Sequence, residues 1–367
     1  MILIAFATSF FATTAGIYFL VPFTHKLGLT DSPDIRKNHV GVIPLIGGIA
    51  IYTTVTVAAL LFIDLSQELL LLLISCGFIV FTGALDDKYN INFRIRLIVQ
   101  SIASLVMIFG VGIKISSLGN LFGLGDVELG ILTVPITVLA YLTIINAFNL
   151  IDGMDGLAGG LSFVSFFTLS LLVGARVSDS TQLILALFMG SLASYLIFNL
   201  NLIPRHLPKV FLGDAGSTLL GFAICTFLIR YTQDKKAIIE PVTAIWFVAI
   251  PLFDMLTTVF RRIKHKKSPF KPDRTHIHHI LLQFFRKKVK KTVFFISLMQ
   301  ILFSLVGLLL ALNTEVLNNS IASVVSLVGF LGITLLFHMI FTGMHKKQVL
   351  LNRLAQRKEK RKRLKTG

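Results

Sequence analysis

Charged side chains are scarce in this chain of 367 residues. They make up 14% of it, whereas hydrophobic residues make up 54% and the mean hydropathy is +0.81. A typical soluble domain has about 25% charged residues, so the composition excludes an ordinary soluble protein. Acidic residues are the rarest charged type, with 18 Asp and Glu against 35 Lys and Arg. We therefore expect a membrane protein.

Cysteine is almost absent. The two cysteines, Cys76 and Cys225, each lie inside an apolar run. Two such residues provide neither a disulfide framework nor a cysteine-based metal cluster. No segment alternates polar and apolar residues with a period of two, which excludes a transmembrane β-barrel.

Long apolar runs, in contrast, are abundant. About 20 apolar residues are needed to cross the hydrocarbon core as a helix. Eleven stretches approach this length; one is short and two are barely separated, so nine to eleven spans are expected. They are residues 1–24, 42–63, 68–85, 97–113, 130–151, 157–175, 181–199, 216–230, 239–260, 292–312 and 321–344. The predicted fold is all-α and polytopic, with about 11 transmembrane helices in one catalytic domain, 1–344, and a basic cytoplasmic tail, 345–367. The first stretch has no basic segment before it and is expected to remain as a span.

The basic residues are distributed unequally between the two sides of the membrane. If the N-terminus is outside, the inner loops and the tail carry 30 of the 35 Lys and Arg. Basic residues favour the cytoplasmic side, which predicts that the N-terminus is outside and the C-terminus inside. The basic tail is expected to be attracted to anionic lipid head groups. It lacks the interleaved aromatic residues of a nucleic-acid platform, so no nucleic-acid partner is expected.

The aspartates gather on the same side. All nine inner ones lie in or beside loops that also carry Gly, Asn, His, Pro or Arg: Asp31, Asp34, Asp86, Asp87, Asp152, Asp155, Asp214, Asp254 and Asp273. Carboxylates near a membrane are costly and usually mark a functional site. We therefore expect one active site built from five inner loops.

The first two of these loops each contain a pair of neighbouring charged residues of one sign. Arg36 and Lys37 suit a lipid phosphate, although ordinary inside-positive charge explains them as well. Asp86 and Asp87 follow an apolar run, where adjacent carboxylates repel unless a cation or a proton is shared. A catalytic or metal-facing pair is the functional interpretation, and a solvated loop pair is the alternative.

The third loop reads from Asn146 through Asn149, Asp152 and Asp155 to Gly156. Asn and Asp oxygens are hard ligands that suit Mg²⁺ or Mn²⁺ better than zinc. A glycine-rich turn with capping residues is the plainer alternative. In the fourth loop Asp214 opens a helix, where free N–H groups face phosphate oxygens. Helix capping alone would also explain it.

The fifth loop contains Arg274, His276, His278 and His279. Three histidines suggest zinc, but a zinc site would need further His or Cys ligands. Contacts to phosphate or sugar fit better. Asp254, inside the preceding apolar stretch, is expected either to pair with a buried base or to position a nearby arginine, and a structural role is equally compatible.

Taken in order, these loops resemble the polyprenyl-phosphate N-acetylhexosamine-1-phosphate transferase family. The resemblance rests on four motifs that span most of the chain: Leu85-Asp86-Asp87, Asn146-Ala-Phe-Asn149-x-x-Asp152-Gly153-x-Asp155-Gly156-Leu, Gly213-Asp214-Ala-Gly216-Ser217-Thr218 and Pro272-Asp273-Arg274-x-His276-Ile277-His278-His279. The His-Ile-His-His form, with Ser268-Pro-Phe and Ser116-Ser-Leu-Gly, is similar to the Gram-negative branch that initiates O-antigen and enterobacterial common antigen.

That resemblance implies transfer of GlcNAc-1-phosphate from UDP-GlcNAc to undecaprenyl phosphate with release of UMP, as the first membrane step of cell-surface polysaccharide synthesis. It implies a bacterial inner-membrane enzyme with its active site on the cytoplasmic side and a Mg²⁺ or Mn²⁺ cofactor. A homodimer is compatible with it. The implied roles are metal binding by Asn149 and Asp214, uracil binding by Asp155, and donor binding by the histidines and the fifth-loop arginine. The implied catalytic residues are Asp86, Asp87 and Asp152.

Phosphoryl transfer depends mainly on positioning and charge neutralisation. We expect a single displacement, with a two-step route through a carboxylate as the rival. A transporter with broken helices and a membrane metallopeptidase built on the histidines are the competing classes.

Overall fold

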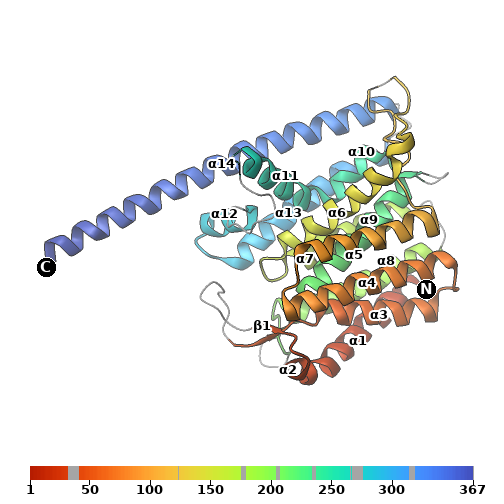
Figure 1. The fold of residues 1–367 in the computed structure, drawn as a ribbon, viewed down its shortest axis with the longest axis horizontal. Helices are drawn as coiled ribbons and strands as arrows, with labels where there is room; N and C mark the ends of the chain where they lie inside the picture. Colours follow the sequence, from red (N-terminus) through yellow and green to blue (C-terminus); the bar gives the residue numbers. More distant parts are fainter. Residues whose placement is uncertain are drawn as a thin grey trace.

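The structure is a computed structural model that describes residues 1–31, 41–122, 124–174, 179–203, 207–233, 237–264, 266, 276–313 and 319–366. These residues are nearly all helical (Figure 1). The α-helices are α1 (Ile2–Leu20), α2 (Thr24–Leu27), α3 (Gly47–Phe62), α4 (Gln67–Tyr89), α5 (Phe93–Val106), α6 (Thr133–Ile151), α7 (Leu157–Gly174), α8 (Asp179–Asn199), α9 (Gly213–Gln233), α10 (Pro241–Ala244), α11 (Ala249–Lys264), α12 (Ile277–Phe284), α13 (Val289–Leu312) and α14 (Asn319–Thr366). Short 3-10 or π segments are η1 (Val21–Phe23), η2 (Met107–Val111), η3 (Gly130–Leu132) and η4 (Ile245–Val248). Strands β1 (Thr30–Asp31) and β2 (Ile43–Pro44) pair antiparallel.

The prediction of an all-α polytopic membrane protein is confirmed. Within the described residues, ten helices or joined helices are long and apolar enough to cross a membrane. The remaining predicted stretch is α3, an apolar helix of 16 residues. Helices satisfy their own backbone hydrogen bonds, which is what a bilayer demands of a spanning segment. The stretch predicted at 216–230 is longer than expected, because α9 begins inside the Gly213-Asp214 motif.

Helix α9 occupies the centre of the bundle. In its apolar window 94% of the residues are buried, and it packs against α3, α4 and α6. Small residues make this possible: a Cβ on Gly48 would collide with the backbone of Gly216, and one on Gly83 would collide with that of Ala215. Small side chains let helix backbones approach closely in membranes. The first turn of α9 is thus held between α3 and α4.

The two ends of the bundle differ. One end carries α2, β1, β2 and α12, and α14 projects beyond the bundle at that end as one continuous helix (Figure 1). The opposite end carries the N-terminus and α10 (Figure 1). The two chain ends therefore lie toward opposite ends of the bundle (Figure 1). The predicted division into a domain of residues 1–344 and a tail stays a prediction.

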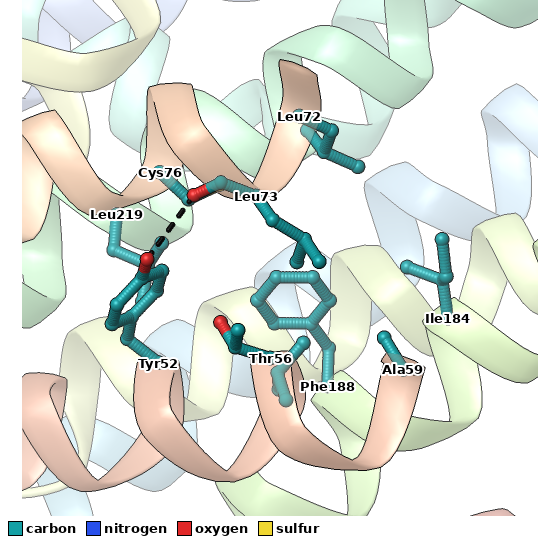
Figure 2. Close-up of a pocket in the computed structure, with 10 residues that line it drawn as sticks. Tyr52, Thr56, Ala59, Leu72, Leu73, Cys76, Ile184, Phe188 and Leu219 are labelled. Carbon is teal, nitrogen blue, oxygen red and sulfur yellow. Dashed lines mark hydrogen bonds between the residues drawn. The ribbon is translucent and has the colours of Figure 1, made fainter. Parts of the chain in front are cut away.

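A narrow apolar cleft lies inside the bundle between α3, α4 and α8 (Figure 2). Tyr52 donates a hydrogen bond across it to the carbonyl oxygen of Leu73, at 3.2 Å. Cys76 lines the cleft, and both Cys76 and Cys225 are buried free thiols. The cysteines are thus part of the packed interior, as the sequence predicted.

Candidate active site

A tight hairpin between α4 and α5 forms the first part of the site. Asn90 ends α4 with φ at +50°, and the side chain of Asn92 accepts a hydrogen bond from the N–H of Arg94 at 3.0 Å. The chain therefore reverses within a few residues, and Arg96 returns alongside α4. Its Nη1 atom lies 2.5 Å from Oδ2 of Asp86. Arg96 was not predicted as a site residue. The signal in the sequence is that Arg96 lies ten residues after Asp86, and that Asn90 and Asn92 between them are typical of the end of one helix and the start of the next.

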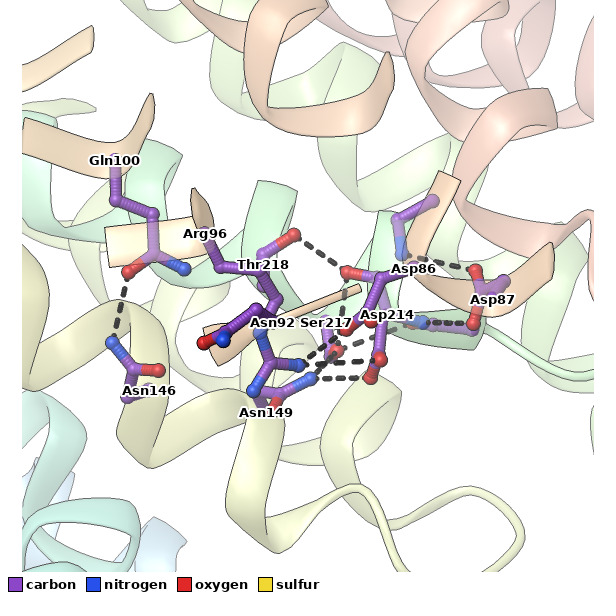
Figure 3. A network of polar contacts seen from close by, with 12 residues as sticks. Asp86, Asp87, Asn92, Arg96, Gln100, Asn146, Asn149, Asp214, Ser217 and Thr218 are labelled. Carbon is purple, nitrogen blue, oxygen red and sulfur yellow. Dashed lines mark hydrogen bonds and ion pairs between the residues drawn. The ribbon is translucent and has the colours of Figure 1, made fainter. Parts of the chain in front are cut away.

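Three separate segments meet at Asp214. Arg96 reaches one of its carboxylate oxygens at 3.4 Å, and the amide of Asn149 donates to the other at 2.6 Å. The same amide lies 3.0 Å from the hydroxyl of Ser217 (Figure 3). The Asp86 side chain is 3% exposed and that of Asp214 is 36% exposed. The site thus combines a buried carboxylate, that of Asp86, with a solvent-accessible one, that of Asp214.

Asp87 has a different environment from its neighbour Asp86. Its two carboxylate oxygens accept hydrogen bonds from the backbone N–H groups of Asp214 at 2.8 Å and Ala215 at 3.2 Å (Figure 3). A carboxylate at this place satisfies unpaired N–H groups and complements the positive end of the helix dipole. Gly213 is needed here, because its φ is +73° and a Cβ would lie 2.5 Å from the carboxylate of Asp87. Asp87 therefore caps α9 from outside that helix.

The Asp152 carboxyl lies where the negative charges crowd together. It is partly buried, and burial raises its pKa well above the usual value for aspartate. The nearby carboxylates of Asp214, Asp87 and Asp155 raise the pKa of Asp152 further, in that order. Loop three and the start of α9 therefore form one electrostatic unit with an excess of negative charge.

The remainder of loop three is joined to the segment before α9. Lys209 pairs with Asp155 at 2.6 Å. The buried side chain of Asn199 accepts from the N–H of Gly156 at 2.5 Å and donates to the carbonyl of Val210 at 2.9 Å. Like Arg96, Lys209 and Asn199 were not predicted from the sequence as site residues. Asp155, the predicted uracil ligand, already has a cationic partner.

The structure describes the two ends of loop one, at strands β1 and β2. The N–H of Phe211 donates to the carbonyl of Pro44 at 2.8 Å, and the N–H of Gly47 donates to the carbonyl of Phe211 at 2.9 Å. These bonds join strand β2 to the segment that leads into α9. The predicted substrate-binding residues Arg36, Lys37 and Arg274 lie outside the described residues.

Helix α12 brings the histidines to loop three. A Cβ on Gly153 would lie 2.5 Å from Nε2 of His278, so the ring faces this glycine directly. His276 and His278 are 4% and 2% exposed, and the ring of His279 lies 4.2 Å from that of His278. Burial lowers the pKa of His278 to about 3; Asp254 raises it, whereas His279 and His276 lower it. His278 is therefore neutral at physiological pH.

Comparison with known proteins identifies the family. The profile of the Glycosyl transferase family 4 matches residues 69–232. A protein of Yersinia pestis named undecaprenyl-phosphate alpha-N-acetylglucosaminyl 1-phosphate transferase is 42% identical over 258 residues, which is 70% of this chain and 70% of that protein. Proteins of the same name from Escherichia coli K12 and Haemophilus influenzae are 39% and 36% identical, over 75% of this chain and 74% and 79% of their own lengths.

The chain belongs to the family of undecaprenyl-phosphate alpha-N-acetylglucosaminyl 1-phosphate transferases. The region matched by the family 4 profile contains Asp86, Asp87, Asn149, Asp152 and Asp214. For this transferase family, the resemblance found in the motifs is confirmed, and so is the assignment of the chain as an enzyme.

The donor set fits a hard divalent cation. Asp86 and Asp214 share one guanidinium, that of Arg96. The carboxylates of Asp214, Asp87 and Asp155 lie close enough to Asp152 to raise its pKa. No three His, Cys, Asp or Glu side chains in the described part of the chain form a ready-made metal site. Mg²⁺ usually binds through one or two carboxylates plus substrate phosphates, not in an all-protein cage. In this transferase the substrates would supply the missing ligands.

Proposed function

We propose that this enzyme transfers GlcNAc-1-phosphate from UDP-GlcNAc to undecaprenyl phosphate, releasing UMP and forming undecaprenyl-pyrophosphoryl-GlcNAc. The names of the relatives in the family support these substrates. The observation that carries the proposal is the convergence on Asp214 of Arg96 from α5 and Asn149 from α6, with Asp86 beside it. With a divalent cation bound to offset the carboxylates, such a cluster would suit a reaction that brings two anionic phosphates together.

Asn149 and Asp214 would hold the divalent cation, Mg²⁺ or Mn²⁺. When bound, the cation neutralises phosphate charge and favours departure of UMP. Asp214 is suited to this role because it is the more accessible carboxylate and lies on the first turn of α9. Its backbone is fixed by Asp87, so the carboxylate does not depend on a mobile loop for its position.

The acceptor would meet the site through a cleft between α4, α5 and α9. This narrow cleft is lined by the apolar side chains of Ile79 and Val99 and by the polar side chains of Arg96 and Asp214. The outer face of α5 exposes Ile95, as a lipid-facing helix does. A lipid phosphate entering from the bilayer would thus reach Arg96 with its isoprenoid tail against apolar side chains.

An oxygen of the lipid phosphate attacks the β-phosphorus of the donor, and the bond from that phosphorus to the bridging oxygen breaks, so that UMP leaves. A phosphomonoester has its second pKa near ~6, so the acceptor is already largely a dianion at neutral pH. A strong general base is therefore not required. Asp86 would orient Arg96 and the acceptor, while Asp87 would keep α9 in place.

The donor would bind on the α12 side of the site. His278 lies against Gly153 of loop three, and the ring of His279 lies beside that of His278. Asp155 of the same loop pairs with Lys209. A neutral His278 offers hydrogen bonds to a phosphate or sugar and no positive charge. Positive charge for the pyrophosphate would come from the basic side chains of the inner loops.

The active site would face the cytoplasm of a bacterial inner membrane. The support is the charge asymmetry of the sequence together with the common end of the bundle at which α12, β1 and the projecting part of α14 lie (Figure 1). UDP-sugars are water-soluble cytoplasmic compounds, which agrees with this orientation. A transporter is less well supported, because the intramembrane Asp254 is paired with a histidine inside the protein.

The test is UMP release by the purified enzyme in detergent with undecaprenyl phosphate and a panel of UDP-GlcNAc, UDP-GalNAc and UDP-MurNAc-pentapeptide. UMP should form with UDP-GlcNAc only when both lipid phosphate and a divalent cation are present. A preference for another donor would refute the sugar assignment. Incubation of labelled donor without lipid tests the single displacement, since a phosphosugar adduct on the protein would instead support the two-step route.

A further inference from the structure

We infer that Asp254 is a positioning residue of the donor site: its carboxylate fixes both the ring of His276 and the first turn of α12, and thereby places His278 against Gly153. The inference rests on the proposed function, because it deepens the account of how that site binds its donor. Asp254 lies in α11, outside the four motifs that carry the family resemblance.

The geometry shows a carboxylate with both oxygens occupied. One oxygen of Asp254 accepts from the N–H of Ile277 at 2.7 Å, and the other lies 2.9 Å from Nδ1 of His276. Side-chain exposure is 3% for Asp254 and 6% for His276. A buried acid is costly unless it is fully partnered. Here the partners are the start of α12 and the first histidine of the motif.

This contact fixes the protonation pattern of the His276 ring. When ionised, the Asp254 carboxylate only accepts hydrogen bonds, and its contact with Nδ1 of His276 then places the hydrogen on that nitrogen. Nε2 then remains the nitrogen available to a ligand, as an acceptor in the neutral ring and a donor when the ring is protonated. In hydrolytic triads the same orienting role belongs to a buried aspartate.

The effect is transmitted to loop three by α12 itself. The rings of His276 and His278 are nearly parallel, at 8° with centroids 5.8 Å apart. His278 in turn faces Gly153, next to the crowded Asp152. Fixing the first turn of α12 from α11 therefore sets the distance between the histidines and the carboxylate cluster.

Two substitutions separate the parts of this role. In Asp254→Asn the amide oxygen can still accept from Ile277, but the NH₂ group faces Nδ1 and favours the opposite tautomer of His276. We expect kcat/KM for UDP-GlcNAc to fall about 10- to 100-fold, the range seen when orienting partners are lost. The KM for undecaprenyl phosphate should stay within twofold and the melting temperature near that of the wild type. Asp254→Ala loses both contacts, so it should also lower the melting temperature.

A double-mutant cycle with His276→Gln tests whether Asp254 acts through the histidine. If it does, the double variant Asp254→Asn/His276→Gln should be no worse than His276→Gln alone. Thr257→Val is the matched control, since Thr257 lies one turn along α11. Among the residues that the structure describes, its hydroxyl binds only backbone carbonyls of that helix. It should keep wild-type kinetics within twofold.

Wild-type donor kinetics in Asp254→Asn, or losses that add to those of His276→Gln, would overturn the inference. Failure of the wild type to release UMP from UDP-GlcNAc would instead refute the proposed function. In that event the tautomer is read directly by ¹⁵N NMR of histidine-labelled protein, with His276→Gln to assign the signal. A hydrogen on Nδ1 that moves to Nε2 in Asp254→Asn supports the role of Asp254, and an unchanged spectrum contradicts it.

Discussion

Replacing Asp87 by alanine should destabilise the protein more than changing its neighbour Asp86. The Asp87 carboxylate accepts from two backbone N–H groups at the start of the buried helix α9, at 2.8 and 3.2 Å. Loss of a helix cap costs about 0.5–2 kcal/mol, and a buried donor left unpaired costs about 1–3 kcal/mol. These overlapping terms give a loss of about 2–4 kcal/mol in the free energy of unfolding.

A thiol-reactive fluorescent dye provides the assay, because Cys76 and Cys225 are 2% and 0% exposed and react only when the bundle opens. We expect the melting temperature of Asp87→Ala to fall by about 3–8 °C. Asp87→Asn retains one hydrogen-bond acceptor, so its melting temperature should lie between that of Asp87→Ala and that of the wild type. Asp86→Asn leaves Arg96 paired with Asp214 and should lose activity with little change in melting.

The opposite order would refute this reasoning. If Asp87→Ala melted like the wild type while Asp86→Asn unfolded several degrees earlier, the carboxylate of Asp87 would not be the cap of α9. Equal melting of all three variants would likewise show that the two hydrogen bonds contribute nothing measurable to stability.

Three further predictions concern packing, acid sensitivity and the cation. Gly83→Ala should push α4 from α9 and reduce kcat at least tenfold, whereas Gly332→Ala, which has open space around it, should be silent in the same UMP assay. The pKa of His278 is lowered to about 3, so between pH 6.5 and 3 the unfolded chain binds a proton that the folded chain does not. The contribution of His278 to the free energy of unfolding is therefore complete above pH 6.5 and about 2 kcal/mol lower at pH 5. His278→Gln should reduce that loss when dye melts at pH 7 and pH 5 are compared. A chelator should abolish UMP release, and Mg²⁺ or Mn²⁺ should restore it; full activity in the chelator would contradict the assignment of Asn149 and Asp214.

Much of the fold could be predicted from the sequence because a bilayer imposes simple rules. Each predicted apolar stretch coincides with a helix, since only a helix satisfies the backbone in hydrocarbon. The apolar stretch at 216–230 is shorter than α9, although Asp214 was expected to open a helix and does lie in the first turn of α9. The cap that Asp87 provides from outside α9 could not be predicted, because it depends on how α4 packs against α9.

The site was predictable as a set of motifs but not as a set of contacts. Asp214 and Asn149 meet as expected. Arg96, Lys209 and Asn199 were missed because each acts on a residue brought near only by folding. In the sequence, Asp86 and Asp87 look like an equivalent pair. In the structure they have separate roles, because Asp86 pairs with the guanidinium of Arg96 and Asp87 caps the start of α9.

The most direct test of the proposed function follows the β-phosphorus of the donor. Purified enzyme is given UDP-GlcNAc labelled at that phosphorus, undecaprenyl phosphate and Mg²⁺, and the lipid and nucleotide products are separated. We predict that the label enters the lipid and that the nucleotide released is UMP, with Asp214→Asn folded but inactive. Label retained in released UDP would show that the sugar alone is transferred, and would contradict the account.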